Sequence, residues 1–227
     1  MRGDDFTQLK LIIFDMDGVL VDSEKFYMKS ELQVIQSFGK EASEDYLRSF
    51  CGTTQDFIWG SIKKDFALDI SLEDLKIKAK NQLIYLFETE EIEAIEHVEK
   101  TLSNLKKAGY LLAVASSSER EIIKRHLIEL DFLKYFNLIK SSEEVAHSKP
   151  APDVFIAVAE ELKVPIEHVV VVEDSTNGIK AAKNAEMICI GYNNLNYPPI
   201  NQEAADIIIS NMSEITPEFL EELVNKK

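Results

Sequence analysis

Short runs of apolar residues, several of them rich in β-branched side chains, alternate along the chain with segments of helical periodicity. The runs are residues 11–14, 110–114, 136–139, 169–172, 187–190 and 205–209. The helical segments between them are residues 97–108, 119–130, 151–163 and 175–186. Uninterrupted apolar runs of this length are typical of strands covered on both faces, as in a parallel sheet. The alternation predicts an α/β fold, with a doubly wound, Rossmann-like parallel-sheet core and residues 205–209 at an edge.

The interval between the first two strands breaks this alternation, because it contains no convincing strand. Helical spacing is expected there at residues 25–38, 54–66 and 71–87. Ser71 and Asp74 are spaced for a capping box at the start of the third of these helices, with Asp in place of the usual Glu or Gln. We interpret the interval as a small inserted helical cap domain, residues 23–92, within a core domain of residues 1–22 and 93–227.

The composition argues against several classes of protein. A formal net charge of −15 over 227 residues disfavours electrostatic binding to nucleic acid or to a membrane surface. No run approaches the roughly 18 apolar residues of a transmembrane helix, and the N-terminal segment lacks the apolar centre of a signal peptide. Two distant cysteines, Cys51 and Cys189, favour reduced thiols, and the four scattered histidines form no zinc motif. We therefore expect a cytoplasmic protein, and a monomer because this architecture is self-sufficient at this size.

Acidic pairs follow two of the predicted strands. Asp15 and Asp17 follow the first strand, and Glu173 and Asp174 follow the strand at 169–172. Ligands of open parallel sheets bind at the carboxyl ends of the strands, and an extended i, i+2 pair points to one face. Carboxylates crowded at one edge need a cation or a shared proton. Such a set of oxygens suits Mg²⁺, whereas each pair taken alone is also typical of a helix cap.

Two further loops at this edge carry candidate groups for binding an anion. Residues 116–118 are three serines between a strand and a helix, where a hydroxyl and backbone N–H groups form a cradle for phosphate oxygens. Taken alone, such a run is more typical of an ordinary helix cap. Lys149 precedes Pro150 and Pro152, which fix the backbone and begin a helix near Ala151. We expect this lysine to hold a defined position instead of extending into solvent.

Together these residues resemble the four motifs of the haloacid dehalogenase superfamily. They are Asp15-Met16-Asp17-Gly18, Ser116, Lys149-Pro150-Ala151-Pro152-Asp153 and Glu173-Asp174-Ser175-Thr176-Asn177-Gly178. The order is similar to that of the subfamily with a helical cap between the first and second motifs, which includes β-phosphoglucomutase-like phosphatases. The resemblance covers about residues 10–210, which is nearly the whole chain.

The resemblance implies a phosphatase that acts through an aspartyl-phosphate. Asp15 would be the nucleophile, and Asp17 would protonate the leaving group and then take a proton from water. Ser116 and the backbone N–H of Ser117 would hold phosphoryl oxygens. Lys149 would neutralise the nucleophile and the phosphate. Positioning and charge stabilisation of this kind account for most of the catalysis in phosphoryl transfer.

The resemblance also implies a metal and a class of substrate. Mg²⁺ would be held by the Asp15 side chain, the Asp17 backbone carbonyl and Asp174, with Glu173 nearby, directly or through water. The substrate would be a small phosphorylated metabolite, a sugar or polyol monophosphate.

The implied cap would contact the rest of the substrate. Gly52, Thr53 and Thr54 resemble the specificity loop of such caps, and Glu24 is a further candidate for binding substrate. Ordinary turn chemistry is the alternative interpretation of these residues. One departure from the family pattern is Glu186, at a helix end where relatives often have glycine; a glutamate there disfavours a left-handed helix end but leaves the active site unaffected.

Two other functions stay open. A hexose-phosphate mutase would use the same nucleophile, but mutases of the β-phosphoglucomutase type carry a histidine and an arginine in the cap. Tyr27 and Gln55 stand at those positions here, and without the arginine a bisphosphate intermediate lacks a bidentate partner. A non-catalytic module that binds phosphorylated metabolites is the third hypothesis, disfavoured by the intact acidic and lysine motifs.

Overall fold

The computed structural model describes residues 9–50, 53 and 55–225. Contacts divide the chain into two compact units. The core unit comprises the segments up to Asp22 and from Glu93 onward, and the helical unit comprises Ser23–Ile92.

A parallel sheet of six strands forms the centre of the core unit, in the order β3-β2-β1-β4-β5-β6. The strands are β1 (Leu11–Phe14), β2 (Leu111–Ser116), β3 (Leu138–Ser141), β4 (Val169–Glu173), β5 (Ile188–Tyr192) and β6 (Ile207–Ile209). Each of the six apolar runs becomes a strand, with bounds that shift by at most two residues. The predicted doubly wound α/β fold is confirmed, with β6 at an edge.

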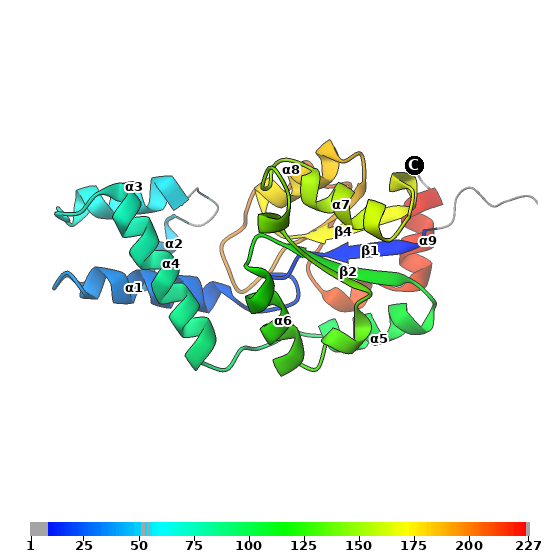
Figure 1. Cartoon of the computed structure of the whole chain (residues 1–227), viewed down its shortest axis with the longest axis horizontal. Helices are drawn as coiled ribbons and strands as arrows, with labels where there is room; N and C mark the ends of the chain where they lie inside the picture. The colour runs from blue at the N-terminus through cyan, green and yellow to red at the C-terminus, as the bar shows by residue number, and fades with distance from the viewer. Residues whose placement is uncertain (1–8, 51–52, 54, 226–227) are drawn as a thin grey trace, which may run out of the picture. The chain divides into compact units, whose positions relative to one another are not determined.

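Helices cover both faces of this sheet. They are α5 (Val98–Lys107), α6 (Arg120–Glu129), α7 (Asp153–Glu161), α8 (Thr176–Asn184) and α9 (Pro217–Asn225). Figure 1 shows α7 and α8 on one side of the sheet and α5 and α6 on the other. On the α7–α8 side, Phe155 and Ile179 belong to one buried cluster with Leu11, Ile13 and Val171 of the strands. Burial on both faces explains why the strands read as uninterrupted apolar runs.

The order of the sheet reverses between β1 and β4. The chain leaves β1 toward β2 and leaves β4 toward β5, in opposite directions along the sheet. Ligands of doubly wound sheets bind outside the strand ends at such a point. The backbone N–H of Asp15 donates to the Val172 carbonyl at 2.9 Å, so the two strand ends stay paired up to the acidic residues. The fold therefore brings the two acidic pairs to one place.

The helical unit contains α1 (Glu24–Gln36), α2 (Glu44–Arg48), α3 (Gln55–Asp65) and α4 (Leu72–Thr89) in its described residues. Three of these helices fall at the predicted positions. The sequence pattern does not predict α2, because five residues are too few to show a helical period. The buried side chains of this unit include Trp59, Ile62 and Leu75.

Two helix ends can be compared with the expectations from local sequence: the start of α4 and the end of α8. Ser71 caps α4, because its Oγ accepts a hydrogen bond from the Asp74 N–H at 3.0 Å. The Asp74 carboxylate contacts the Ser71 hydroxyl at 2.6 Å, so only half of the predicted capping box forms. Beyond α8, Glu186 adopts a left-handed conformation, with φ of +60°, so the replacement of glycine does not remove the left-handed helix end.

Glu31 on α1 gives the helical unit a pH-dependent stability. Burial, aided by the charge of Glu24, raises the pKa of Glu31 to about 7 from 4.5. The folded state therefore keeps this proton while the unfolded state loses it, and the free energy of unfolding falls as the pH rises from about 4.5 to about 7. We expect Glu31→Gln to stabilise the protein by on the order of 1–2 kcal/mol at pH 8 and to have little effect at pH 4.5.

Chemical denaturation at both pH values measures this difference. Glu41→Gln is the matched control, because Glu41 is exposed in the same unit. Equal stabilisation by Glu31→Gln at both pH values would contradict the assignment.

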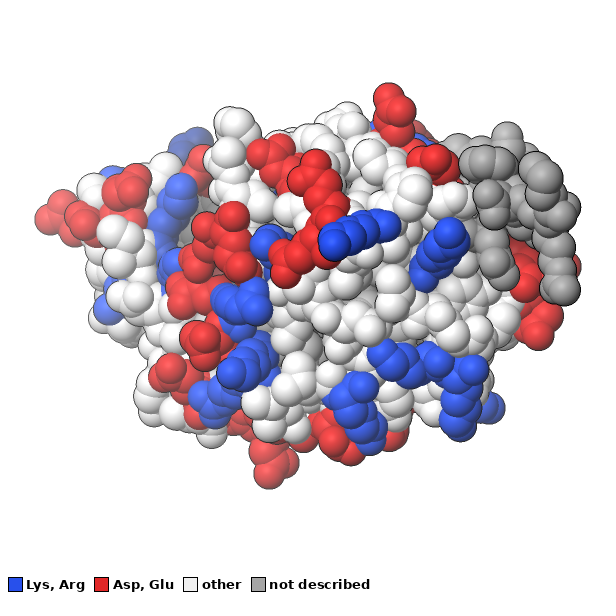
Figure 2. All heavy atoms as spheres, turned by 45° about the vertical axis from the view of Figure 1, so that its right-hand side comes forward, with Lys and Arg blue, Asp and Glu red and all other residues white. Residues whose placement is uncertain are grey.

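The described part of the chain contains no helix that is long and apolar enough to cross a membrane. The face drawn in Figure 2 carries lysine and arginine interspersed with aspartate and glutamate. A continuous basic surface, the electrostatic footprint of nucleic-acid binding, is not seen on that face.

Candidate active site

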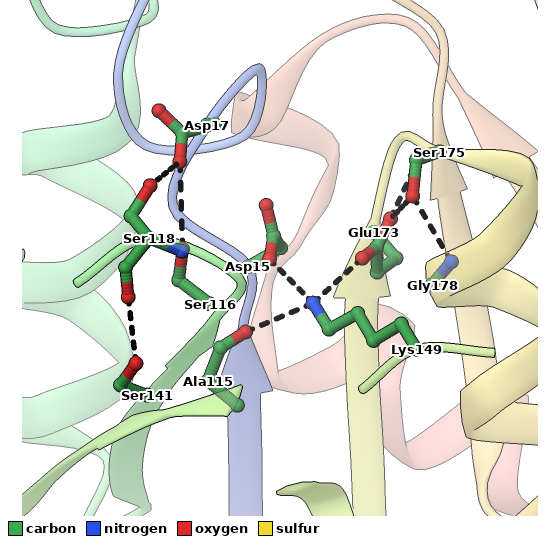
Figure 3. A network of polar contacts seen from close by, with 10 residues as sticks. All are labelled: Asp15, Asp17, Ala115, Ser116, Ser118, Ser141, Lys149, Glu173, Ser175 and Gly178. Carbon is green, nitrogen blue, oxygen red and sulfur yellow. Dashed lines mark hydrogen bonds and ion pairs between the residues drawn. The ribbon is translucent and has the colours of Figure 1, made fainter. Parts of the chain in front are cut away.

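The side chain of Lys149 lies at the centre of a buried polar network at the ends of β1, β2 and β4 (Figure 3). Its Nζ donates to Asp15 Oδ1 at 2.5 Å, to Glu173 Oε1 at 2.9 Å and to the Ala115 carbonyl at 3.0 Å. The three acceptors use all three donors of the ammonium group. Only 4% of the Lys149 side chain is exposed, so the lysine is held in place as the proline-rich loop predicts.

The electrostatics of this network indicate a surplus of negative charge. Burial raises the pKa of Asp15 to about 8, and Glu173 and Asp17 act in the same direction while Lys149 opposes them. Against the effect of its own burial, the carboxylates of Asp15 and Glu173 raise the pKa of Lys149. One ammonium group thus faces several carboxylates, and a further cation would favour the ionised form of Asp15.

Asp17 points away from Lys149 and toward the serine loop after β2 (Figure 3). Its Oδ2 accepts from the Ser118 hydroxyl at 2.6 Å and from the Ser116 hydroxyl at 3.4 Å. Its Oδ1 is buried without a hydrogen-bond partner among the described residues. The two aspartates therefore have different neighbours, because the strand ends at Phe14 and the extended i, i+2 geometry does not continue. Different neighbours suit different chemical roles.

The serine loop does not cap α6. The N-cap residue of that helix is Glu119, whose side chain makes no capping bond. Ser116 is fully buried, and its Oγ also accepts from the Ser118 N–H at 3.0 Å. Ser117 is exposed at the turn. The ordinary cap interpretation is thus wrong for this run, and two of its hydroxyls face Asp17.

Glu173 accepts hydrogen bonds from Lys149 and from Ser175. Its Oε1 accepts from Lys149, and its Oε2 accepts from the Ser175 N–H at 2.7 Å and the Ser175 hydroxyl at 2.9 Å. Both oxygens thus accept hydrogen bonds, and the place of Glu173 near the metal stays a prediction. Gly178 makes room for the Glu173 side chain, because a Cβ at that position would lie 1.6 Å from Glu173 Oε1.

Asp174 packs against the loop that follows β1. A Cβ on Gly18 would lie 2.1 Å from Asp174 Oδ2, and Gly18 has φ of +77°. Both observations require glycine at this position. The Asp174 carboxylate thus lies against Gly18, the residue that follows Asp17.

The described residues contain no group of three His, Cys, Asp or Glu side chains arranged as a metal cage. The predicted donor set is the Asp15 and Asp174 carboxylates and the Asp17 backbone carbonyl, with Glu173 nearby, directly or through water, and a backbone carbonyl is not one of the groups of such a cage. Mg²⁺ is usually bound by one or two carboxylates together with water and substrate phosphate. The unpartnered Asp17 Oδ1 and the surplus of carboxylates are consistent with a cation at this edge.

The structure says less about the predicted substrate-binding residues of the helical unit than about those of the core unit. Gly52 and Thr54 lie outside the described residues, and Thr53 is exposed, with its hydroxyl donating to the Phe50 carbonyl at 2.7 Å. Glu24 is the first residue of α1. Gln55 accepts a hydrogen bond from the Trp59 indole at 3.0 Å.

Sequence reasoning missed two residues of this region. Ser118 makes the shorter hydrogen bond to Asp17, although only its neighbours Ser116 and Ser117 were singled out. Gln202, from the loop before β6, donates to the Asp174 carbonyl at 2.6 Å. The run of serines was a signal for the first, and no local pattern pointed to the second.

Comparison with known proteins identifies relatives over most of the chain. The model of the haloacid dehalogenase-like hydrolase family matches residues 12–192. A phosphorylated carbohydrates phosphatase of Thermotoga maritima is 34% identical over 178 residues, 78% of this chain and 82% of the relative. A phosphoglycolate phosphatase of Vibrio parahaemolyticus is 29% identical over 223 residues, 91% of this chain and 94% of the relative. A Thermotoga maritima crystal structure, provisionally named β-phosphoglucomutase, has a TM-score of 0.72 at 29% identity and covers 96% of this chain and 98% of its own.

Proposed function

Because the chain belongs to the haloacid dehalogenase-like hydrolase family, we propose that it hydrolyses small phosphorylated metabolites through a phosphoryl group carried on Asp15. The family and its phosphatase relatives make the chain a phosphoric monoester hydrolase. The single observation that carries the finer proposal is the buried contact of Asp15 with Lys149, beside a second aspartate with separate partners.

Two displacements at phosphorus make up the proposed reaction. A carboxylate oxygen of Asp15 attacks phosphorus, its bond to phosphorus forms, and the bond to the substrate oxygen breaks. Asp17 donates a proton to that leaving oxygen and then takes one from the attacking water. The water oxygen bonds to phosphorus, the bond to Asp15 breaks, and inorganic phosphate leaves. Each aspartate thus returns to its starting state.

The remaining residues position and neutralise charge. Lys149 offsets the negative charge of Asp15 and of the transferring group, and Glu173 holds Lys149. Ser116 and the Ser117 N–H hold phosphoryl oxygens. Mg²⁺ would be held by Asp15, the Asp17 carbonyl and Asp174, and when bound it supplies positive charge that stabilises the phosphoryl oxygens and the ionised nucleophile. Electrostatic positioning is the main source of rate enhancement in phosphoryl transfer.

Ser118 orients the general acid in this proposal. Ser118→Ala removes the 2.6 Å hydrogen bond to Asp17, and a hydrogen bond to a charged group corresponds to about tenfold or more in rate. We expect kcat on an alkyl phosphate to fall by about tenfold with little change in KM. The loss in the rate of the first displacement, measured in a single turnover, should be smaller on a dinitrophenyl phosphate, whose leaving group needs no proton. Equal losses on the two substrates would remove Ser118 from this role.

The substrate we propose is a sugar or polyol monophosphate. A relative named for phosphorylated carbohydrates supports the class, and the phosphoglycolate relative shows that it is not the only candidate. A screen that measures phosphate release from sugar phosphates, polyol phosphates and phosphoglycolate tests the choice. The highest kcat/KM on phosphoglycolate would overturn it.

A hexose-phosphate mutase is the second candidate, favoured by the similarity to the structure provisionally named β-phosphoglucomutase. Incubation with β-glucose 1-phosphate and a catalytic amount of the bisphosphate separates the two reactions. We expect free phosphate to form faster than glucose 6-phosphate. The opposite order would assign the chain to the mutases.

We also propose a monomer that works in the cytoplasm on a small metabolite, without nucleic-acid or membrane partners. The buried free thiol of Cys189 is consistent with a reducing compartment. Light scattering coupled to gel filtration tests the oligomeric state, and a mass of two chains would contradict it.

A further inference from the structure

The buried side chain of Gln202 contacts the strand end that carries Asp174. Gln202 lies between β5 and β6 and is 5% exposed. Its Nε2 donates to the Asp174 carbonyl at 2.6 Å and to the Tyr192 carbonyl at 2.7 Å. Both acceptors are carbonyl oxygens, so only the nitrogen of the amide can face them. The orientation of this amide is thereby fixed.

The carbonyls of Asp174 and Tyr192 come directly after the last residues of β4 and β5 that pair with each other. The ladder between these strands ends with Glu173 opposite Gly191. Asp174 and Tyr192 are the next residues of the two strands. The side chain of Gln202 therefore bridges the strands at the point where their backbone pairing stops.

Neighbouring residues leave room for the Gln202 amide and hold its loop in place. A Cβ on Gly191 would lie 3.1 Å from Gln202 Oε1 and 3.1 Å from the Ala205 side chain, so a larger residue at this position would crowd the amide. The Ala205 N–H donates to the Gln202 carbonyl at 2.9 Å, and the Thr176 hydroxyl donates to the Asn201 carbonyl at 2.8 Å. The second bond ties the loop to the first residue of α8.

The amide oxygen of Gln202 makes no hydrogen bond to a described residue that would offset its burial. Gln202 Oε1 is buried and has no hydrogen-bond partner in the described part of the chain. An apolar side chain of similar length would avoid the cost of burying that oxygen. The polar residue is therefore best explained by the two bonds that its nitrogen donates.

We propose that Gln202 is a positioning residue that fixes Asp174 for metal binding. The inference rests on the proposed function, in which Asp174 is a ligand of Mg²⁺. Gln202 holds the backbone from which the Asp174 carboxylate projects, and that carboxylate packs tightly against Gly18. Removal of a group that orients a metal ligand typically weakens metal affinity by about 10–100-fold.

Gln202→Met keeps the length of the side chain and removes both donors. We expect the Kd of Mg²⁺, measured on the full chain by isothermal titration calorimetry, to rise by about tenfold or more. The Mg²⁺ concentration for half-maximal phosphatase activity should rise in parallel, while kcat at saturating Mg²⁺ is largely retained. A merely structural role would lower thermal stability and leave the Kd unchanged. Glu203→Gln, at an exposed neighbour in the same loop, is the matched control and should bind Mg²⁺ like the wild type.

The outcomes separate this inference from the proposed function. An unchanged Kd in folded Gln202→Met would overturn the inference and leave the proposed function standing. A wild-type chain that binds no Mg²⁺ would overturn the metal part of the proposed function and the inference with it.

A second variant and a direct measurement cover the case in which Gln202→Met does not fold. Gly191→Ala crowds the amide while retaining Gln202, and should raise the Kd in the same direction. In the wild type, the NMR signals of the Gln202 side-chain amide should shift when Mg²⁺ is added. Signals that do not move would contradict the proposal.

Discussion

An Asp15→Asn protein should remain folded and lose hydrolysis of an aryl phosphate by at least about 10⁴-fold in kcat. The amide has nearly the same shape as the carboxylate but is a far weaker nucleophile toward phosphorus. Asp15 is 6% exposed, and burial raises its pKa, so loss of the carboxylate does not leave a new buried charge at this position. Lys149 keeps its bonds to Glu173 and to the Ala115 carbonyl.

The measurement is steady-state release of phosphate at saturating Mg²⁺, with circular dichroism to establish the fold. Asp69→Asn is the matched control, since Asp69 is exposed in the helical unit. The control should have wild-type activity. Turnover by folded Asp15→Asn within tenfold of the wild type would exclude Asp15 as the nucleophile.

A Lys149→Met protein should lose both stability and activity. The ammonium group is the shared partner of the buried carboxyl groups of Asp15 and Glu173, and its removal leaves the Glu173 carboxylate without its buried counter-charge. Breaking a buried pair by removing one partner typically costs about 3–5 kcal/mol in the free energy of unfolding. Loss of a positive group from the site of charge development should also lower kcat by about 10²–10³-fold.

Chemical denaturation and steady-state kinetics on the same preparation test both effects. Lys140→Met is the control, because Lys140 also contacts two glutamates but lies at the partly exposed end of β3. Lys140→Met should lower the free energy of unfolding by no more than about 1 kcal/mol and leave kcat unaltered. A Lys149→Met protein with the stability and kcat of the wild type would exclude Lys149 from the site.

Most of the core unit follows from its sequence, because its strands are buried on both faces and therefore lack polar interruptions. The order of the strands does not follow from those runs alone, since residues 136–139 and 205–209 are similar in length and lie at opposite edges of the sheet. In the helical unit, α2 was missed because five residues show no period.

The sequence predicts which residues form the candidate site better than it predicts the contacts between them. Asp15, Lys149 and Glu173 lie in one network of hydrogen bonds, and Asp17 lies at the same edge of the sheet with Ser116 and Ser118 as its partners (Figure 3). The sequence could not show that the Glu173 carboxylate accepts hydrogen bonds from Lys149 and Ser175, because these contacts depend on the directions of the side chains at the end of β4. Gln202 could not be foreseen either, since only the folded chain brings residue 202 to residue 174.

Trapping the phosphoryl group on Asp15 is the sharpest test of the proposed mechanism. An Asp17→Asn enzyme lacks the acid and base, but dinitrophenyl phosphate has a leaving group that needs no proton, so the first displacement should proceed and the second should stall. We expect a burst of one dinitrophenolate per enzyme. Mass spectrometry after an acid quench should locate one phosphoryl group on Asp15, released by hydroxylamine. Dinitrophenolate released without a burst or an adduct, or an adduct on another residue, would contradict the account.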